Sequence, residues 1–169
     1  VESMGSAPGR FSSLTLDLAD QVSIDSAIRS IVALPQTIDG VVFAAGSAHG
    51  ALSLMTRDSD LRRTFQVNAF GPFRVLQGIS RKLSQKASCV FVSSVSSSLP
   101  QRGSTVYGSS KAALERMVIG LALELAESGI RVNVLRPGPI DTPMLEEMDP
   151  ARKDELLNRS FSKLVHSPR

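Results

Sequence analysis

Hydrophobic residues occur along the chain in two kinds of run, and each kind predicts a different element. Short runs without helical spacing predict strands over residues 11–16, 41–46, 88–94 and 130–135. Longer runs, with apolar positions three or four apart, predict helices over residues 21–34, 58–84, 107–128 and, in a more polar segment, 144–163.

Residues that favour helix ends or kinks fall at the edges of these runs. Asp20 is suited to cap the first helix, and Pro35 stops it. Gly71 and Pro72 interrupt the second helix and predict a kink there. Gly129 follows the third helix, where glycine commonly ends a helix.

Strands that alternate with helices indicate an α/β fold built on a parallel sheet. The run at 41–46 is apolar without alternation, which predicts a strand covered on both faces. In such sheets ligands bind beyond the carboxyl ends of the strands. The residues that follow the predicted strands are Asp17, Gly46, Ser94, and Pro137 with Gly138.

Composition excludes several classes of protein. With 169 residues, 42% of them hydrophobic and 21% charged, the chain fits one folded domain. The net charge is only +3 and the basic residues are scattered, so we expect no nucleic-acid partner. No apolar run approaches the roughly 20 residues of a membrane helix, so we expect no membrane partner. The lone Cys89 suits a reducing compartment, and we expect a cytoplasmic protein. His49 and His166 are isolated, so no metal site is expected.

Four polar residues are candidates for catalysis. Tyr107 and Lys111 lie one helical turn apart on one face, so an ammonium near the phenol would lower the pKa of Tyr107. The Ser94 hydroxyl could hold a substrate oxygen beside that phenol. Asn68, just before the kink, could hold a water that relays protons through the lysine. Taken singly, each residue has an ordinary structural explanation, such as a surface helix pair or a turn. Their occurrence in order at strand ends and helix starts favours a catalytic role.

Three stretches place these residues in a specific order. Asn68 lies within residues 65–73, Ser94 within 92–94, and Tyr107 and Lys111 within 107–113, followed by 131–142 with its Pro-Gly pair. Together they resemble the short-chain dehydrogenase/reductase family. The resemblance spans about residues 11–165. It implies a Rossmann-like, doubly wound parallel sheet and hydride transfer between NAD or NADP and a carbonyl or secondary alcohol.

The resemblance also implies a role for each site residue. Tyr107 would be the acid/base, Ser94 would orient the substrate, and Lys111 would also hold the nicotinamide ribose, with Asn68 completing the catalytic set. The cofactor site would include Asp17 at the adenine and the turn at Ala45 and Gly46. Facing the nicotinamide it would include the loop residues Pro137, Gly138, Ile140 and Thr142.

Two departures from the family pattern stand out. Phe43-Ala44-Ala45-Gly46 replaces the usual Asn-Asn-Ala-Gly, so the turn is kept without its asparagines. No Gly-rich phosphate loop of the GxxxGxG or GxGxxG kind occurs. We therefore expect residues 1–169 to be a partial, single Rossmann-type domain from the middle of a longer dehydrogenase, without its first two strands and its last strand.

The resemblance implies a small keto or hydroxy substrate, and a homodimer or homotetramer formed through the helices at 58–84 and 107–128. The segment with Met144, Leu145 and Met148 would form a substrate lid. An alternative from another class is a catalytically silent relative that acts as a ligand sensor or assembly partner. The missing phosphate loop favours that alternative, whereas the complete set of four catalytic candidates opposes it.

Overall fold

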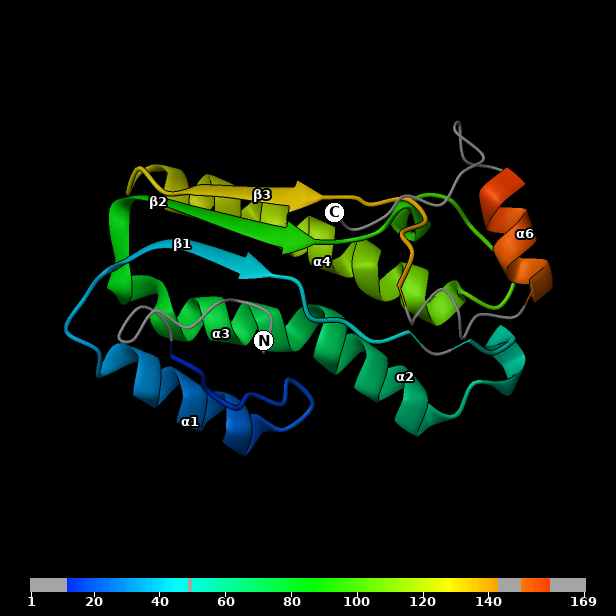
Figure 1. Ribbon diagram of the computed structural model, residues 1–169, viewed down its shortest axis with the longest axis horizontal. Helices are drawn as coiled ribbons and strands as arrows, with labels where there is room; N and C mark the ends of the chain where they lie inside the picture. Colours follow the sequence, from blue (N-terminus) through cyan, green and yellow to red (C-terminus); the bar gives the residue numbers. More distant parts are fainter. Residues whose placement is uncertain (1–11, 49, 143–149, 159–169) are drawn as a thin grey trace.

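Three parallel strands form the centre of the molecule. The computed structural model describes residues 12–48, 50–142 and 150–158. The strands are β1 (Ile38–Phe43), β2 (Leu83–Val92) and β3 (Arg131–Leu135), in the order β1-β2-β3. Val41 pairs with Cys89, and Cys89 pairs with Val132. All three arrowheads in Figure 1 point the same way, so the carboxyl ends of the strands share one edge.

Helices precede, connect and follow the strands, and the helix predicted over residues 58–84 ends earlier than expected because Leu83 already belongs to β2. The helices are α1 (Gln21–Val32), α2 (Asp58–Phe65), α3 (Gly71–Ile79), α4 (Thr105–Ala126) and α6 (Pro150–Asn158). Short 3-10 turns η1 (Ser53–Met55), η3 (Ser80–Lys82) and η4 (Val95–Ser97) lie between them. Asp20 caps α1 by accepting a hydrogen bond from the Val22 N–H at 3.0 Å, as expected. The remainder of the helix predicted over 144–163 lies outside the described residues.

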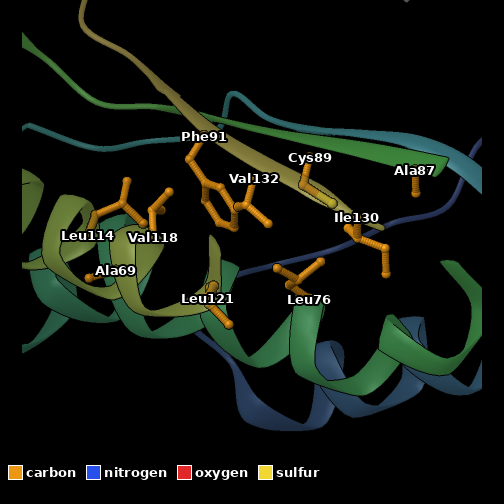
Figure 2. Close-up of a cluster of buried hydrophobic side chains, with 10 residues drawn as sticks. All are labelled: Ala69, Leu76, Ala87, Cys89, Phe91, Leu114, Val118, Leu121, Ile130 and Val132. Atoms are coloured by element: carbon orange, nitrogen blue, oxygen red, sulfur yellow. The ribbon is translucent and has the colours of Figure 1, made fainter. Parts of the chain in front are cut away.

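The core lies between the sheet and a layer of helices. Alternate residues of β2, including Cys89 and Phe91, point toward α3 and α4 and are fully buried. Figure 2 shows them meeting Leu76 from α3 and Val118 from α4. Phe91 also stacks on Phe43 of β1, with ring centroids 4.3 Å apart. This packing fixes α4 beneath the carboxyl ends of β2 and β3.

The opposite face of the sheet is open in the described part of the chain. Val42 is 68% exposed and Leu135 is 55% exposed, because the packed helices cover the other face. The expectation that β1 is covered on both faces is therefore wrong for the described residues. In β1 the uncovered Val42 is as apolar as the covered Val41 and Phe43, so the sequence of this strand did not distinguish its two faces.

Residues 12–17 form no strand, contrary to the prediction for 11–16, of which Phe11 lies outside the described residues. A strand needs a partner for its backbone groups, and the described sheet contains only β1, β2 and β3. The chain instead makes a turn into α1. There the Asp17 N–H donates to Ser23 Oγ at 2.9 Å, and the Ala19 N–H donates to Asp17 Oδ1 at 2.8 Å.

The predicted kink in the second helix is a π-helical turn, η2 (Gln66–Phe70), directly before Gly71. A glycine is needed at 71 because a Cβ there would lie 2.9 Å from the carbonyl oxygens of both Gln66 and Leu18. No helix in the described residues is long and apolar enough to cross a membrane.

Candidate active site

The loops that leave the three strands converge at one edge of the sheet. Gly46 follows β1, Ser94 follows β2, and Pro137 follows β3. The Val95 N–H donates to the Pro137 carbonyl at 3.1 Å, which ties the second and third of these loops together. The predicted site residues of the three strand ends are thus brought to a common edge, as the parallel topology requires.

Tyr107 and Lys111 occupy the first two turns of α4, on the side that faces these loops. Lys111 Nζ lies 6.0 Å from the centre of the Tyr107 ring. Ser94 lies beside Tyr107 and favours the ionised form of its phenol. The Ser94 Oγ also accepts the Ser96 N–H at 3.1 Å, which caps η4 and fixes the rotamer of the serine. The structure therefore brings Ser94, Tyr107 and Lys111 together.

Burial controls the ionisation of both helical residues. Burial raises the pKa of Tyr107, while the neighbouring Ser94 hydroxyl acts in the opposite direction without reversing the shift. The expectation that the neighbouring lysine leaves the phenol with a lowered pKa is therefore wrong in this structure. Burial also lowers the pKa of Lys111 from 10.5 to about 8. The ammonium thus loses its proton close to neutral pH.

Lys111 is held from two sides. It is only 3% exposed, and its Nζ donates to the Val92 carbonyl at 2.8 Å. The chain at Gly46 passes so close that a Cβ there would lie 3.3 Å from both Lys111 Nζ and Asn68 Oδ1. A glycine at this position lets the loop after β1 approach the catalytic candidates.

Asn68 lies in the π-helical turn and is 1% exposed. Its Oδ1 accepts the Ser47 N–H at 2.8 Å, and its Nδ2 donates to the Ser47 carbonyl at 2.8 Å and to Ser110 Oγ at 2.9 Å. Both N–H groups of the amide are used. Asn68 therefore joins the loop after β1 to α4, and these N–H groups are not available for the predicted water.

The remaining cofactor candidates lie along the same edge or at its margin. A Cβ at Gly138 would meet no atom within 4 Å, so the backbone there borders open space. Thr142 Oγ1 donates to the Ile140 carbonyl at 3.3 Å, which bends the end of this loop. Asp17 stays in its own turn before α1. The lid residues Met144, Leu145 and Met148 lie outside the described residues.

This edge fits the nicotinamide ribose end of a dinucleotide. An ammonium has three N–H donors, and among the described residues the Val92 carbonyl takes one from Lys111. Its other donors can bind hydroxyl oxygens, and the adjacent turn at Ala45 and Gly46 is itself exposed to solvent. Gly138 leaves the opposite side open.

Sequence reasoning missed five residues that support the site. They are Ser47 and Ser110, which bind Asn68, and a group formed by the buried Ser93 and Glu115 with the half-exposed Arg136. Two signals could have pointed to the charged pair. Glu115 stands one turn beyond Lys111 on an otherwise apolar helix face, and Arg136 directly precedes Pro137.

Comparison with known proteins places this site in context. The profile of the family described as short chain dehydrogenase matches residues 1–153. The chain is 34% identical over 137 residues to 2,3-dihydro-2,3-dihydroxybenzoate dehydrogenase of Escherichia coli K12. That match covers 79% of this chain and 55% of the enzyme, so the chain spans little more than half of that relative's length.

Solved structures agree with the fold. A dehydrogenase/reductase from Sinorhizobium meliloti 1021 superposes with a TM-score of 0.85 at 32% identity, covering 96% of this chain and 64% of that one. A blue fluorescent protein from a metagenomic library, solved in complex with NADPH, gives a TM-score of 0.80 at 30% identity, covering 90% and 62%. The matched profile extends over the strands, α4 and all four catalytic candidates, and the chain therefore belongs to the short-chain dehydrogenase/reductase family.

Proposed function

We propose that the protein containing this chain interconverts a carbonyl and a secondary alcohol, using NAD or NADP, with Tyr107 as the proton donor and acceptor. The observation that carries the proposal is the grouping of Ser94, Tyr107 and Lys111, with Ser94 beside the phenol and Lys111 Nζ 6.0 Å from the centre of the ring. The loop after β2 supplies Ser94 and α4 supplies Tyr107 and Lys111, so the arrangement depends on how α4 packs against the strand ends.

A bound nicotinamide would supply the hydride, while the chain supplies position and proton transfer. Lys111 would hold the ribose of the cofactor, beside the turn at Ala45 and Gly46. Facing the nicotinamide would be the loop that contains Pro137, Gly138, Ile140 and Thr142. Asp17 would meet the adenine. The complex of NADPH with a related protein supports the use of this kind of cofactor.

The proton path follows from the ionisation of the two helical residues. Because the pKa of Tyr107 is raised, the phenol keeps its proton at neutral pH and can donate it to a developing alkoxide. Ser94 would hold the same oxygen through its hydroxyl. In the reverse direction the phenolate must form, and the Lys111 ammonium, present below a pH of about 8, would favour it.

We further propose a small keto or hydroxy substrate, a cytoplasmic location and a homodimer or homotetramer. The assembly proposal draws on exposed apolar residues of the two helices that follow β1 and β2. Ile119 and Leu123 of α4 are 57% and 73% exposed, and Leu61 of α2 is 42% exposed. The helices α2 and α4 contact each other, so these side chains belong to adjoining elements.

The test is a Tyr107→Phe substitution in the full-length protein, assayed for NADH and NADPH oxidation with a panel of ketones. Removing the phenol oxygen should lower kcat by roughly 100-fold or more, with cofactor binding retained. Ser109→Ala, an exposed position on the same helical turn, should behave as wild type. Wild-type turnover in Tyr107→Phe would refute the mechanism. Cofactor binding without turnover of any ketone by the unmodified protein would instead favour the sensor alternative.

A further inference from the structure

Glu115 is a buried carboxylate that the proposed proton path does not use. It lies on α4 one turn beyond Lys111 and is 8% exposed. Its Oε1 accepts hydrogen bonds from Ser93 Oγ at 2.6 Å and from Arg136 Nε at 2.8 Å. Its Oε2 pairs with Arg136 Nη2. We call Ser93, Glu115 and Arg136 the Glu115 cluster.

Each member of the Glu115 cluster is next to a residue of the candidate active site. Ser93 directly precedes Ser94, and Arg136 directly precedes Pro137. Glu115 shares the face of α4 that carries Tyr107 and Lys111. The Glu115 cluster thus joins the ends of β2 and β3 to the catalytic helix, one helical turn beyond Lys111.

Backbone hydrogen bonds extend the same connection. The Ser93 N–H donates to the Leu135 carbonyl at 2.8 Å, and the Val95 N–H donates to the Pro137 carbonyl at 3.1 Å. These bonds fix the loop after β2 to the loop after β3. Neither of these two bonds reaches α4. The Glu115 carboxylate connects both strand ends to α4, in addition to the bond from Lys111 Nζ to the Val92 carbonyl.

Stability alone is a poor reason to keep this carboxylate. Burial by itself would raise the pKa of Glu115, but hydrogen bonds with Ser93 and Arg136 and the arginine charge hold it below its usual value. The ion pair with Arg136 is half-exposed, because 51% of the arginine side chain is accessible to solvent, and exposed ion pairs contribute little to stability. The pair does impose direction, because a guanidinium that binds both carboxylate oxygens permits few orientations.

We propose that Glu115 is a positioning residue, which through Ser93 and Arg136 sets the placement of Ser94 and of the Pro137-Gly138 loop relative to Tyr107 and Lys111. The proposal rests on the proposed function, since it assigns the Glu115 cluster a task in that reaction. Glu115 itself touches neither substrate nor cofactor.

The test compares Glu115→Gln, Ser93→Ala and Arg136→Lys in the full-length protein, with Arg136→Met as the uncharged reference for the arginine. Glutamine keeps the size of Glu115 but loses its charge, and alanine removes the Ser93 hydroxyl. Lysine keeps the charge of Arg136 but loses the planar guanidinium that binds both carboxylate oxygens. Matched controls are Glu124→Gln on the exposed side of α4 and Arg131→Lys at an exposed position of β3. Each variant is assayed for kcat, KM and thermal unfolding.

A second readout reports the placement of Tyr107 without any turnover. Tyr107 is the single tyrosine of this chain. With tyrosine labelled by carbon-13 at Cζ, the resonance that disappears in Tyr107→Phe belongs to Tyr107. Its chemical shift follows the hydrogen bonding of the phenol oxygen, and a purely structural role for Glu115 would leave it unchanged in a folded variant.

We expect kcat to fall about 10- to 100-fold in Glu115→Gln and Ser93→Ala, as for small displacements of reacting groups, with KM changed less than about three-fold. The Tyr107 resonance should move in the same variants, and Arg136→Lys should keep more activity than Arg136→Met. The two controls should match wild type. If Glu115→Gln does not fold, Ser93→Ala and Arg136→Lys carry the test.

Wild-type kcat and an unmoved Tyr107 resonance in folded Glu115→Gln or Ser93→Ala would overturn the proposal, as would a loss of thermal stability alone. The two proposals fail in different ways. If Tyr107→Phe turns over normally, the proposed function fails. The resonance then decides the positioning role by itself: a moved resonance supports it, and an unmoved one overturns it.

Discussion

Lys111 combines near-complete burial with a charge, and this combination makes its protonation state sensitive to conditions. Its pKa is lowered by burial from 10.5 to about 8. Below that pH the folded protein must hold a buried ammonium, which its bond to the Val92 carbonyl compensates only in part. Lys111 is therefore both a candidate catalytic group and a source of pH-dependent stability.

The free energy of unfolding should rise as the pH increases from about 8 to about 10. In this window the unfolded chain keeps a proton on Lys111 that the folded chain has lost, so the unfolded state binds more protons. The contribution is up to about 1.4 kcal/mol per pH unit. Urea unfolding of wild type and Lys111→Met at several pH values measures it.

The difference in free energy between the two proteins should grow by about 1–2 kcal/mol across that window, in favour of wild type. Lys86→Met, at an exposed position of β2, provides the control and should follow wild type in its pH dependence. Parallel curves for wild type and Lys111→Met would contradict the assignment.

Gly46 controls how closely the loop after β1 approaches the site. In Gly46→Ala the new Cβ would lie 3.3 Å from Lys111 Nζ and from Asn68 Oδ1, which is tighter than an ordinary van der Waals contact. We expect kcat to fall about ten-fold through displacement of the ammonium, with a smaller effect on stability. In Gly40→Ala, on β1, the Cβ would meet the Ser88 carbonyl at an ordinary 3.7 Å, so steady-state kinetics should match wild type. Equal kinetics for both variants would refute this role of Gly46.

Among the elements, α4 depends on the turn that connects it to β3. Gly129 has a φ of 73°, and a Cβ there would lie 2.4 Å from the Gln85 carbonyl oxygen. Gly129→Ala should therefore destabilise the protein by about 2 kcal/mol or more, through strain and a backbone clash.

Gly120→Ala supplies the matched comparison, since this glycine lies within α4 and its Cβ would meet only the end of Arg116, at 4.0 Å. Alanine is favoured over glycine inside a helix by about 1 kcal/mol, so this variant should be neutral or more stable. Chemical unfolding of both variants measures the contrast. A Gly129→Ala protein as stable as Gly120→Ala would contradict the structure.

Elements with strong local signals were predictable from the sequence. Asp20 and Gly129 end their helices as expected, because capping and positive φ depend on nearby residues. The π-helical turn at Asn68 could not be predicted from the sequence. A change from i–4 to i–5 hydrogen bonding in a helix has no clear sequence pattern. The strand expected at 11–16 was wrong because a strand depends on a partner elsewhere in the molecule.

In the candidate site, too, some residues were predictable from the sequence and others only from the tertiary structure. The order of Ser94, Tyr107 and Lys111 is local enough to be read from spacing, and the fold brings them together as predicted. The Glu115 cluster joins residues from β2, α4 and the end of β3, so only the tertiary structure reveals it. The direction of the Tyr107 pKa also required the structure, because burial outweighs the effects that favour the phenolate.

At the scale of the whole molecule, the exposed apolar side chains of α4 predict self-association. Leu123→Glu should shift the full-length protein toward a monomer in analytical ultracentrifugation, since a charge would be buried in the interface. Val22→Glu on α1 is the control, because Val22 and Leu123 are both 73% exposed. An unchanged sedimentation coefficient for Leu123→Glu would exclude this face of α4 from the assembly.

The two backbone bonds beyond the ends of β2 and β3 also govern how the site moves in time. Since Ser93 binds Leu135 and Val95 binds Pro137, neither loop can open locally without the other. We expect the amide protons of Ser93 and Val95 to exchange with solvent slowly and at similar rates, as members of one cooperative unit. On the timescale of turnover, the edge that carries Ser94 and Pro137 would then behave as a rigid platform.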